Sequence, residues 1–489
     1  MTSETNEQTG AAGQDKPIDW GTDSRMSPVD TVMWRGDADR NLRSTISMLE
    51  LYDCTPDWDR LVAAHEWGSR MAPRFRQRVI EAPLQAGPPS WSVDPDFDLH
   101  YHLRRIRIGG DGSMRELLAT CEQLAMTPLD PRRPPWEGYL IEGLPDGRSA
   151  YFLKAHHALT DGLGAIIALA QLHSPTRDPI PGKPQPPAPE VHEPSALDVL
   201  RTQLGEEAER IPRLAGMALE GVLALRNPKR ALSRVLRYGR SVPRVAGLVS
   251  PPGSPLLAGR SGSWRFAAFE VPFTSLKAAA TATNASINDV YLGGLIGGFR
   301  KYHERNDVMV DAIPVAIPIS VREAGEQGGG NRIAVGRLAG PVGIDDAFER
   351  VLTCREQVRA ARNEPAVDVF NTAGPVLAWM PGQLLAQFSG TTAGNDLQAS
   401  NVPGIPWDTF VAGAKVERMF PFGPLPGCAV MATMITHNGI ACLGLNFDAA
   451  AIVDPDLFAE CLVDGFNEVI ALAATSDDEP PLPPMIRVE

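Results

Sequence analysis

Residues 155–162 have the sequence AHHALTDG, which places two imidazoles, a carboxylate and a glycine within eight positions. Neutral imidazole is the side chain best suited to removing a proton near pH 7, so His156 and His157 are candidate general bases. Because consecutive residues leaving a strand point to opposite sides, we do not expect both rings to reach the same proton. Asp161 could hold the loop through an ion pair or hydrogen bonds, and Gly162 permits a tight turn.

Two other interpretations of this cluster remain open from the residues alone. A histidine at the end of a strand commonly has only a structural role within its loop. A His/Asp cluster also binds metal, but HHxxxD lacks the HExxH spacing of helical zinc sites, and no further segment rich in metal ligands is present. The chain contains no GxSxG motif, which argues against a serine nucleophile.

The segments on either side of AHHALTDG have different periodicities. Residues 149–155, SAYFLKA, are strand-like, whereas residues 163–172, LGAIIALAQL, place apolar side chains at helical spacing, so the motif is predicted on a strand-to-helix loop. In the second half, Asn438–Gly439 between two apolar runs predicts a hairpin, and residues 455–473 predict a closing helix. Strands mixed with helices in both halves indicate an α/β or α+β architecture.

Composition suggests the organisation of the chain. Residues 1–25 are small and polar and residues 475–489 are acidic and rich in proline, so we expect both ends to be disordered. A proline-rich span that begins at Ser174 predicts an extended linker. Together with helical residues that follow it, this linker forms a connecting segment, 174–259, between a first lobe, 26–173, and a second lobe, 260–474.

The overall composition limits the compartment and the partners. The net charge of −13 over 489 residues gives no general nucleic-acid footprint. Six cysteines without paired spacing predict reduced thiols. The N-terminus lacks the pattern of a signal peptide, and no apolar run reaches about 18 residues. We therefore expect a cytoplasmic protein whose membrane contact is peripheral.

Residues 226–244 form a basic segment in this acidic chain. The sequence RNPKRALSRVLRYGRSVPR carries one lysine, six arginines and no acidic residue. One interpretation is an amphipathic element that binds anionic lipid, with apolar side chains on one face and arginines that reach outward. The other is a solvated helix packed across the two lobes, and the sequence leaves both open.

The HHxxxDG pattern resembles the signature of acyltransferases with a chloramphenicol-acetyltransferase-like fold, which include nonribosomal peptide condensation domains. Further segments make the chain similar to one branch, the bacterial wax ester synthase/diacylglycerol acyltransferase family. In family order they are MSPVDTVMW at 26, DFDLHYHLRRIRI at 96, TPLDPRRPPWEGYLIEGLPDG at 127, INDVYLGG at 287, PISVR at 318 and SNVPGI at 400. The resemblance covers residues 26–474. It departs at Pro134–Pro135–Trp136, where the family usually has Pro-Leu-Trp, so the same acceptor pocket is not assumed there.

This resemblance implies two similar lobes with the active site in a tunnel at their interface, open to acyl-CoA from one side and to an alcohol from the other. It implies that His157 takes the hydroxyl proton of the acceptor, whose oxygen attacks the thioester directly, without an acyl-enzyme. His156 would support the loop. Asp161 would fix the loop through an arginine, for which Arg322 is one candidate.

The resemblance also carries expectations for other motif positions. Asn288 would orient the alcohol or stabilise the oxyanion, and Asp289 would support the start of a helix. An alternative interpretation of INDVYLGG is a helix with a capped start and nothing more. The positions expected to bind substrate are Trp136, Ser320, Arg322, Ser400 and Asn401.

The expected function is the synthesis of a neutral storage lipid. The preferred reaction joins diacylglycerol and acyl-CoA to give triacylglycerol and CoA, with wax ester formation from a long-chain alcohol as the close alternative. No metal or cofactor is implied, and residues 226–244 would bind the inner membrane face or lipid droplets. Two alternatives remain: a condensation-type enzyme that takes its acyl group from a carrier protein, and a non-catalytic lipid-surface protein of the same fold.

Overall fold

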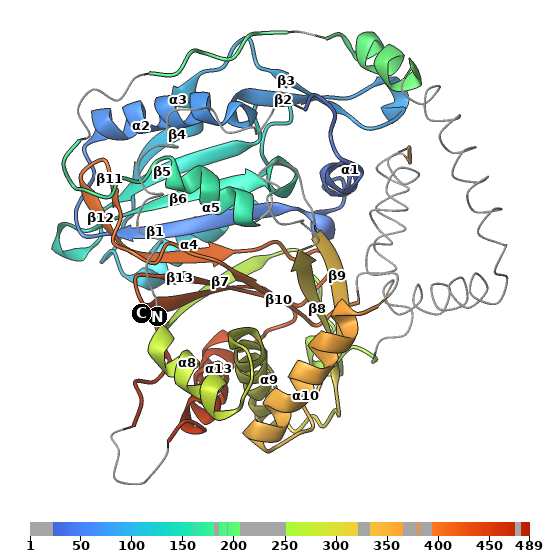
Figure 1. The fold of residues 1–489 in the computed structure, drawn as a ribbon, viewed down its shortest axis with the longest axis vertical. Helices are drawn as coiled ribbons and strands as arrows, with labels where there is room; N and C mark the ends of the chain where they lie inside the picture. The colour runs from blue at the N-terminus through green and yellow to red at the C-terminus, as the bar shows by residue number, and fades with distance from the viewer. Residues whose placement is uncertain are drawn as a thin grey trace, which may run out of the picture.

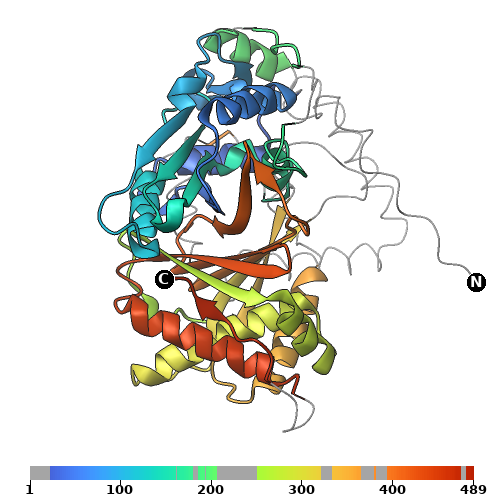
Figure 2. The same ribbon diagram turned by 90° about the vertical axis from the view of Figure 1, so that its left-hand side faces the viewer.

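The computed structural model describes residues 23–160, 162–179, 185–192, 194–205, 251–320, 333–364, 379–380, 394–474 and 481–489. Within them, two large sheets lie one above the other, with a group of helices above the first sheet and another group below the second (Figure 1). The turned view shows the same two layers of strands between an upper and a lower group of helices (Figure 2). The mixed α/β architecture predicted from the sequence is confirmed.

The first sheet has the strand order β11-β12-β1-β6-β5-β4. Its neighbours are antiparallel except for the parallel pair β4 and β5. The strands are β1 (Thr45–Tyr52), β4 (Leu103–Arg107), β5 (Trp136–Glu142), β6 (Ser149–His156), β11 (Phe410–Val411) and β12 (Ala414–Phe422). Helices α2 (Trp58–Met71) and α5 (Gly162–Ala170) lie over the face of this sheet that presents Leu153, and α3 (Leu99–His102) lies beside α2. Helix α4 (Met114–Met126) packs on the opposite face, where Lys154 donates to the Leu124 carbonyl.

The second sheet has the order β15-β7-β14-β13-β10-β8-β9, with β10 parallel to both of its neighbours. Its strands are β7 (Trp264–Pro272), β8 (Ile313–Ser320), β9 (Ile333–Gly340), β10 (Leu397–Val402), β13 (Val430–His437), β14 (Ile440–Asp448) and β15 (Ile486–Arg487). Below it lie α8 (Phe273–Ala282), α9 (Ile287–Arg305), α10 (Ala347–Arg362) and α13 (Pro455–Ala471) (Figure 1). A small ribbon of β2 (Gln77–Ile80) and β3 (Ser90–Val93) stands beside α1 (Pro28–Gly36).

The second half of the chain completes the first sheet. Strand β12 pairs antiparallel with β1, for example Ser47 opposite Phe422. The ring of Phe422 stacks on Phe266 of β7 at 4.1 Å between centroids, so the two sheets touch at this end. The division between lobes at 26–173 and 260–474 therefore does not coincide with the division between the sheets.

Several predicted elements are confirmed. The strand before AHHALTDG is β6, the helix after it is α5, and the closing helix is α13. The predicted hairpin joins β13 to β14, and both turn residues have positive φ, 44° at Asn438 and 78° at Gly439. Asparagine and glycine tolerate this left-handed backbone, which matches the right-handed twist of the strands.

The prediction that the two ends are disordered is wrong where the structure describes them. Arg25 forms a β-bridge with Ser90. At the other end, β15 pairs with β7, and the Met485 side chain is buried in the second core. The apolar residues after the prolines therefore pack against the second sheet, although residues 475–489 are polar overall. Residues 475–480 lie outside the described residues.

All six cysteines are free thiols. Among the described helices, none is both long enough and apolar enough to span a bilayer.

Candidate active site

The loop that carries AHHALTDG is held by its neighbours in the first sheet. Strand β6 ends at His156, a 3-10 turn covers His157–Leu159, and α5 begins at Gly162. The His156 N–H donates to the carbonyl of Pro135 at 2.9 Å, and the His157 N–H donates to the carbonyl of Ser44 at 2.7 Å. The predicted strand-to-helix loop is confirmed, and the backbone at His157 is fixed by the chain that leads into β1.

His156 is buried behind this loop. Its Nδ1 accepts a hydrogen bond from the Ala158 N–H at 3.0 Å, and its Nε2 lies 3.3 Å from the Asp37 carboxylate. The edge of its ring packs on Trp34 at 5.0 Å between centroids. Asp37 also accepts the Ser44 N–H at 2.7 Å, so it links both strands that meet at the loop. These contacts are those of a residue that supports a loop.

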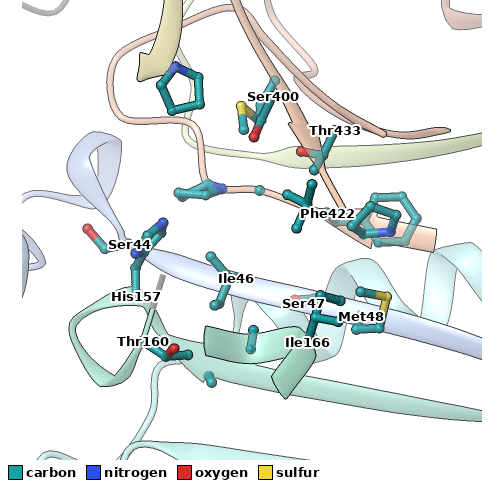
Figure 3. A pocket seen from close by; sticks show the side chains of 18 of the residues that line it. Ser44, Ile46, Ser47, Met48, His157, Thr160, Ile166, Ser400, Phe422 and Thr433 are labelled. Carbon is teal, nitrogen blue, oxygen red and sulfur yellow. The ribbon is translucent and has the colours of Figure 1, made fainter. Parts of the chain in front are cut away.

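His157 lines a cavity of about 230 Å³ between the two sheets (Figure 3). Strands β1 and β6 and helix α5 form one side, and the second sheet forms the other. Because side chains alternate along a strand, every second residue of β10 and β13 points into this space. These residues are Gln398, Ser400, Val402, Met431, Thr433 and Ile435. Most of the wall is apolar, which suits a hydrocarbon ligand.

Two hydroxyls lie together on the second-sheet wall of the cavity. Ser400 and Thr433 are register partners on the parallel strands β10 and β13. Figure 3 shows both across the cavity from His157. The Thr433 hydroxyl is buried and has no hydrogen-bond partner within the described part of the chain. A buried hydroxyl without a partner costs about 1–3 kcal/mol, so a polar atom of a substrate could satisfy it.

Asn288 and Asn401 meet each other, and neither lines the cavity with His157. The Asn401 side-chain amide donates to the Asn288 side-chain carbonyl at 2.6 Å, and both side chains are exposed. The physical reason is the alternation of β10, which turns Ser400 inward and Asn401 outward toward the start of α9. The structure therefore does not bring the Asn288 amide to the acceptor position that the resemblance implied.

Asp289 supports the start of α9 through a capping box. The Ser286 hydroxyl accepts the Asp289 N–H at 3.3 Å, and the Asp289 carboxylate accepts the Ser286 N–H at 2.8 Å. The prediction that Asp289 starts a helix is confirmed.

Trp136 is a core residue with 2% of its surface exposed. Its ring stacks between His102, at 4.7 Å, and His65, at 6.3 Å, and its Nε1–H donates to the carbonyl of Phe75 at 2.7 Å. It lines a smaller neighbouring cavity rather than the cavity that contains His157. Pro135 precedes β5, so its missing N–H removes no bond from the sheet.

The remaining predicted positions are described only in part. Asp161, Arg322 and the basic segment 226–244 lie outside the described residues. Gly162 is the first residue of α5, and Ser320 ends β8, where its backbone alone is described.

Two residues at the candidate site, Asp37 and Thr433, were not predicted from the sequence. The alternation in CAVMATMI signals a strand, but no pattern in the sequence marks the sheet that Thr433 will face.

The chain matches two sequence models. One, described as the wax ester synthase/diacylglycerol acyltransferase catalytic domain, matches residues 26–291, and the other, the WS/DGAT C-terminal domain, matches residues 329–469. A Mycobacterium tuberculosis H37Rv protein named as a diacylglycerol O-acyltransferase is 40% identical over 453 residues, 92% of each chain. A second protein of that strain with the same type of name is 30% identical, over 88% of this chain and 93% of its own length.

Solved structures show the same fold. The wax ester synthase/diacylglycerol acyltransferase from Marinobacter aquaeolei VT8 matches with a TM-score of 0.60 at 22% identity, over 92% of this chain and 100% of that one. The first condensation domain of the calcium-dependent antibiotic synthetase, in complex with a substrate analogue, also has a TM-score of 0.60, at 16% identity over 94% and 99% of the two chains. The predicted chloramphenicol-acetyltransferase-like fold is confirmed.

Proposed function

The chain belongs to the wax ester synthase/diacylglycerol acyltransferase family, and on this premise we propose that it transfers an acyl group from acyl-CoA to diacylglycerol. The products are triacylglycerol and free CoA. The observation that carries the proposal is the position of His157, whose ring lies in a largely apolar cavity between the two sheets. An apolar cavity whose described lining includes a histidine and a few hydroxyls suits a lipid alcohol and a fatty acyl thioester.

In the proposed mechanism His157 acts as the general base. It takes the proton of the acceptor hydroxyl while the acceptor oxygen forms a bond to the thioester carbonyl carbon. The carbon–sulfur bond then breaks, and the imidazolium returns its proton to the CoA sulfur. No acyl-enzyme forms and no metal or cofactor takes part. A positioned base of this kind contributes about 10² to 10⁴ in rate.

His156 and Asp161 are assigned supporting roles. The contacts of His156 with Ala158, Asp37 and Trp34 favour a role in positioning His157 rather than in proton transfer. Asp161 remains assigned to the loop by its family motif alone.

Two relatives named as diacylglycerol O-acyltransferases support diacylglycerol as the acceptor. A long-chain alcohol that gives a wax ester is the second candidate, because its hydroxyl and hydrocarbon chain would meet the same base and the same apolar wall. The two acceptors differ in their ester carbonyls, which diacylglycerol has and a fatty alcohol lacks.

The test measures release of free CoA thiol from palmitoyl-CoA in the presence of dioleoylglycerol or hexadecanol. We expect release to depend on an added alcohol and to fall by about 10² to 10⁴ in His157→Ala. The matched control is His100→Ala, which changes an exposed histidine. If neither alcohol stimulates the wild type, the proposal is wrong, and an acyl carrier protein is the next donor to supply.

We also propose that the protein binds lipid surfaces peripherally through residues 226–244. The support is the charge of this segment, seven basic residues and no acidic one. Charge reversal at Arg230, Arg234 and Arg237 should weaken co-sedimentation with vesicles that contain phosphatidylglycerol, while leaving thiol release with detergent-dispersed substrates unchanged. Equal co-sedimentation of the wild type and the variant would exclude this role.

A further inference from the structure

A second, smaller cavity of about 30 Å³ adjoins the cavity that contains His157. It lies between the first sheet and helices α2 and α5. Three residues line both cavities and form the partition between them: Phe75, Leu153 and Leu169. The smaller cavity therefore lies directly behind one wall of the larger cavity.

The smaller cavity is suited to hydrocarbon rather than to water. His65, which lines it, has Nδ1 2.8 Å from the Leu61 carbonyl and Nε2 2.6 Å from the Tyr151 hydroxyl. The Ser69 hydroxyl donates to the Glu66 carbonyl at 3.2 Å. A buried water needs two to four polar partners, and these groups are already engaged with one another. Most of the surface that remains exposed to the cavity is apolar.

The partition is thin and incompletely packed. Leu153 lies on β6, an interior strand between β1 and β5, yet it is only half-buried, as is Phe75. Both line the two cavities. Side chains of this kind can change rotamer while the backbone stays in place.

We propose that the smaller cavity receives the terminal methylenes of a substrate hydrocarbon chain whose reacting end lies at His157, and that Phe75, Leu153 and Leu169 form the passage between them. This proposal rests on the proposed function, because it places the lipid in the larger cavity. This hydrocarbon chain is that of the acyl-CoA or that of the alcohol, because both substrates contain a hydrocarbon of the same chemistry. The smaller cavity then limits the length of the chain that is used efficiently.

The test fills the smaller cavity with Ala168→Leu. Ala168 is buried and lines this cavity only, whereas Ala170, on the same helix, is exposed, so Ala170→Leu is the matched control. Values of kcat/KM are measured for octanoyl-, lauroyl-, palmitoyl- and stearoyl-CoA at one fixed alcohol, and then for alcohols of the same lengths at one fixed acyl-CoA. Each methylene excluded from an apolar site should lower kcat/KM about fourfold.

We expect Ala168→Leu to lose activity with the longer chains in one of the two series and to keep it with octanoyl-CoA and octanol. The series in which the loss occurs shows whether the smaller cavity binds the hydrocarbon of the acyl-CoA or that of the alcohol. Leu153→Ala, which opens the partition, should move the preference toward longer chains in the same series. An opposite shift of this kind cannot come from general loss of folding. An equal loss at all lengths with both variants, or no change, would overturn the proposal.

Binding of cis-parinaric acid, followed by its fluorescence, separates this proposal from the proposed function. If the wild type shows no alcohol-dependent thiol release, the function fails, but weaker parinarate binding by Ala168→Leu than by Ala170→Leu still supports the hydrocarbon site. If the wild type is active and both variants bind parinarate equally, the site is excluded and the function stands.

Discussion

At the scale of single residues, His65 and His102 differ from His157 in their surroundings. Both are buried against the faces of Trp136, and burial lowers the pKa of each to about 4. Each has one ring nitrogen within hydrogen-bond distance of a backbone carbonyl, Leu61 for His65 and Trp136 for His102. They therefore pack as neutral rings behind the cavity that contains His157.

These two pKa values predict how stability depends on pH. The unfolded histidines titrate near 6.5, so below that pH the unfolded state binds more protons than the folded state. The stabilisation is complete above about pH 6.5 and is lost as the pH falls toward 4, by about 2 kcal/mol per histidine at pH 5. His65→Gln, which does not titrate, should lose less free energy of unfolding between pH 7 and pH 5 than the wild type in urea titrations. The control His100→Gln should behave as the wild type, and identical slopes in all three proteins would contradict the prediction.

The local sequence predicted the position of His157, because that position depends on the chain nearby. The strand before AHHALTDG and the helix after it are both visible in the apolar pattern, which placed the motif on the loop between them. Asp37 and Thr433 could not be found this way, since they reach the site through pairing between distant segments. The motif that contains Asn288 was recognised from the sequence, but its contact with Asn401 was not. That contact depends on which side chains of β10 point away from the cavity, and the sequence does not show this.

At the scale of elements, helices α9 and α13 pack with their backbones in contact. A Cβ placed on Gly465 of α13 would meet the backbone of Gly297 and Gly298 in α9 at 2.6 Å or less. Helix α9 contains four glycines in the sequence GGLIGG. Each glycine lowers the stability of a helix by about 1 kcal/mol relative to alanine. The close approach that they allow buries both helices against the second sheet and explains why they are tolerated.

Gly465→Ala should therefore destabilise the protein by about 1–3 kcal/mol through overpacking. Thermal unfolding monitored by circular dichroism measures the effect. Gly109→Ala is the matched control, because a Cβ there has no neighbour within 4 Å. We expect kcat of the folded Gly465→Ala protein to stay near that of the wild type, since this contact lies on the far side of the second sheet from the cavity. A melting temperature equal to that of Gly109→Ala would show that the helices can separate without cost.

At the scale of the whole molecule, the two halves of the chain, before and after the proline-rich span, each contribute an element that packs with the sheet of the other half. Strand β12, from the second half, pairs with β1 in the first sheet. In helix α4, from the first half, the Glu122 carboxylate accepts a hydrogen bond from the Phe266 N–H of β7 at 2.8 Å. The composition of the sequence located the proline-rich span. It could not predict that β12 pairs with β1, because these strands lie more than 350 residues apart and their pairing leaves no local pattern. The cavity with His157 lies between the sheets and depends on both halves.

This exchange predicts that neither half folds alone. A fragment of residues 1–205 lacks β11 and β12, so the edge of β1 and the apolar side chains of Met48, Leu49 and Leu51 would be left without their partners. We expect this fragment to aggregate or to show no cooperative thermal transition when expressed alone. Co-expressed with residues 206–489, it should co-purify and recover thiol release that depends on His157, because the β1–β12 pairing then forms between two chains. A cooperative melt of the isolated fragment would show instead that four strands and their helices suffice, and that β12 contributes to the cavity but not to folding of the first sheet.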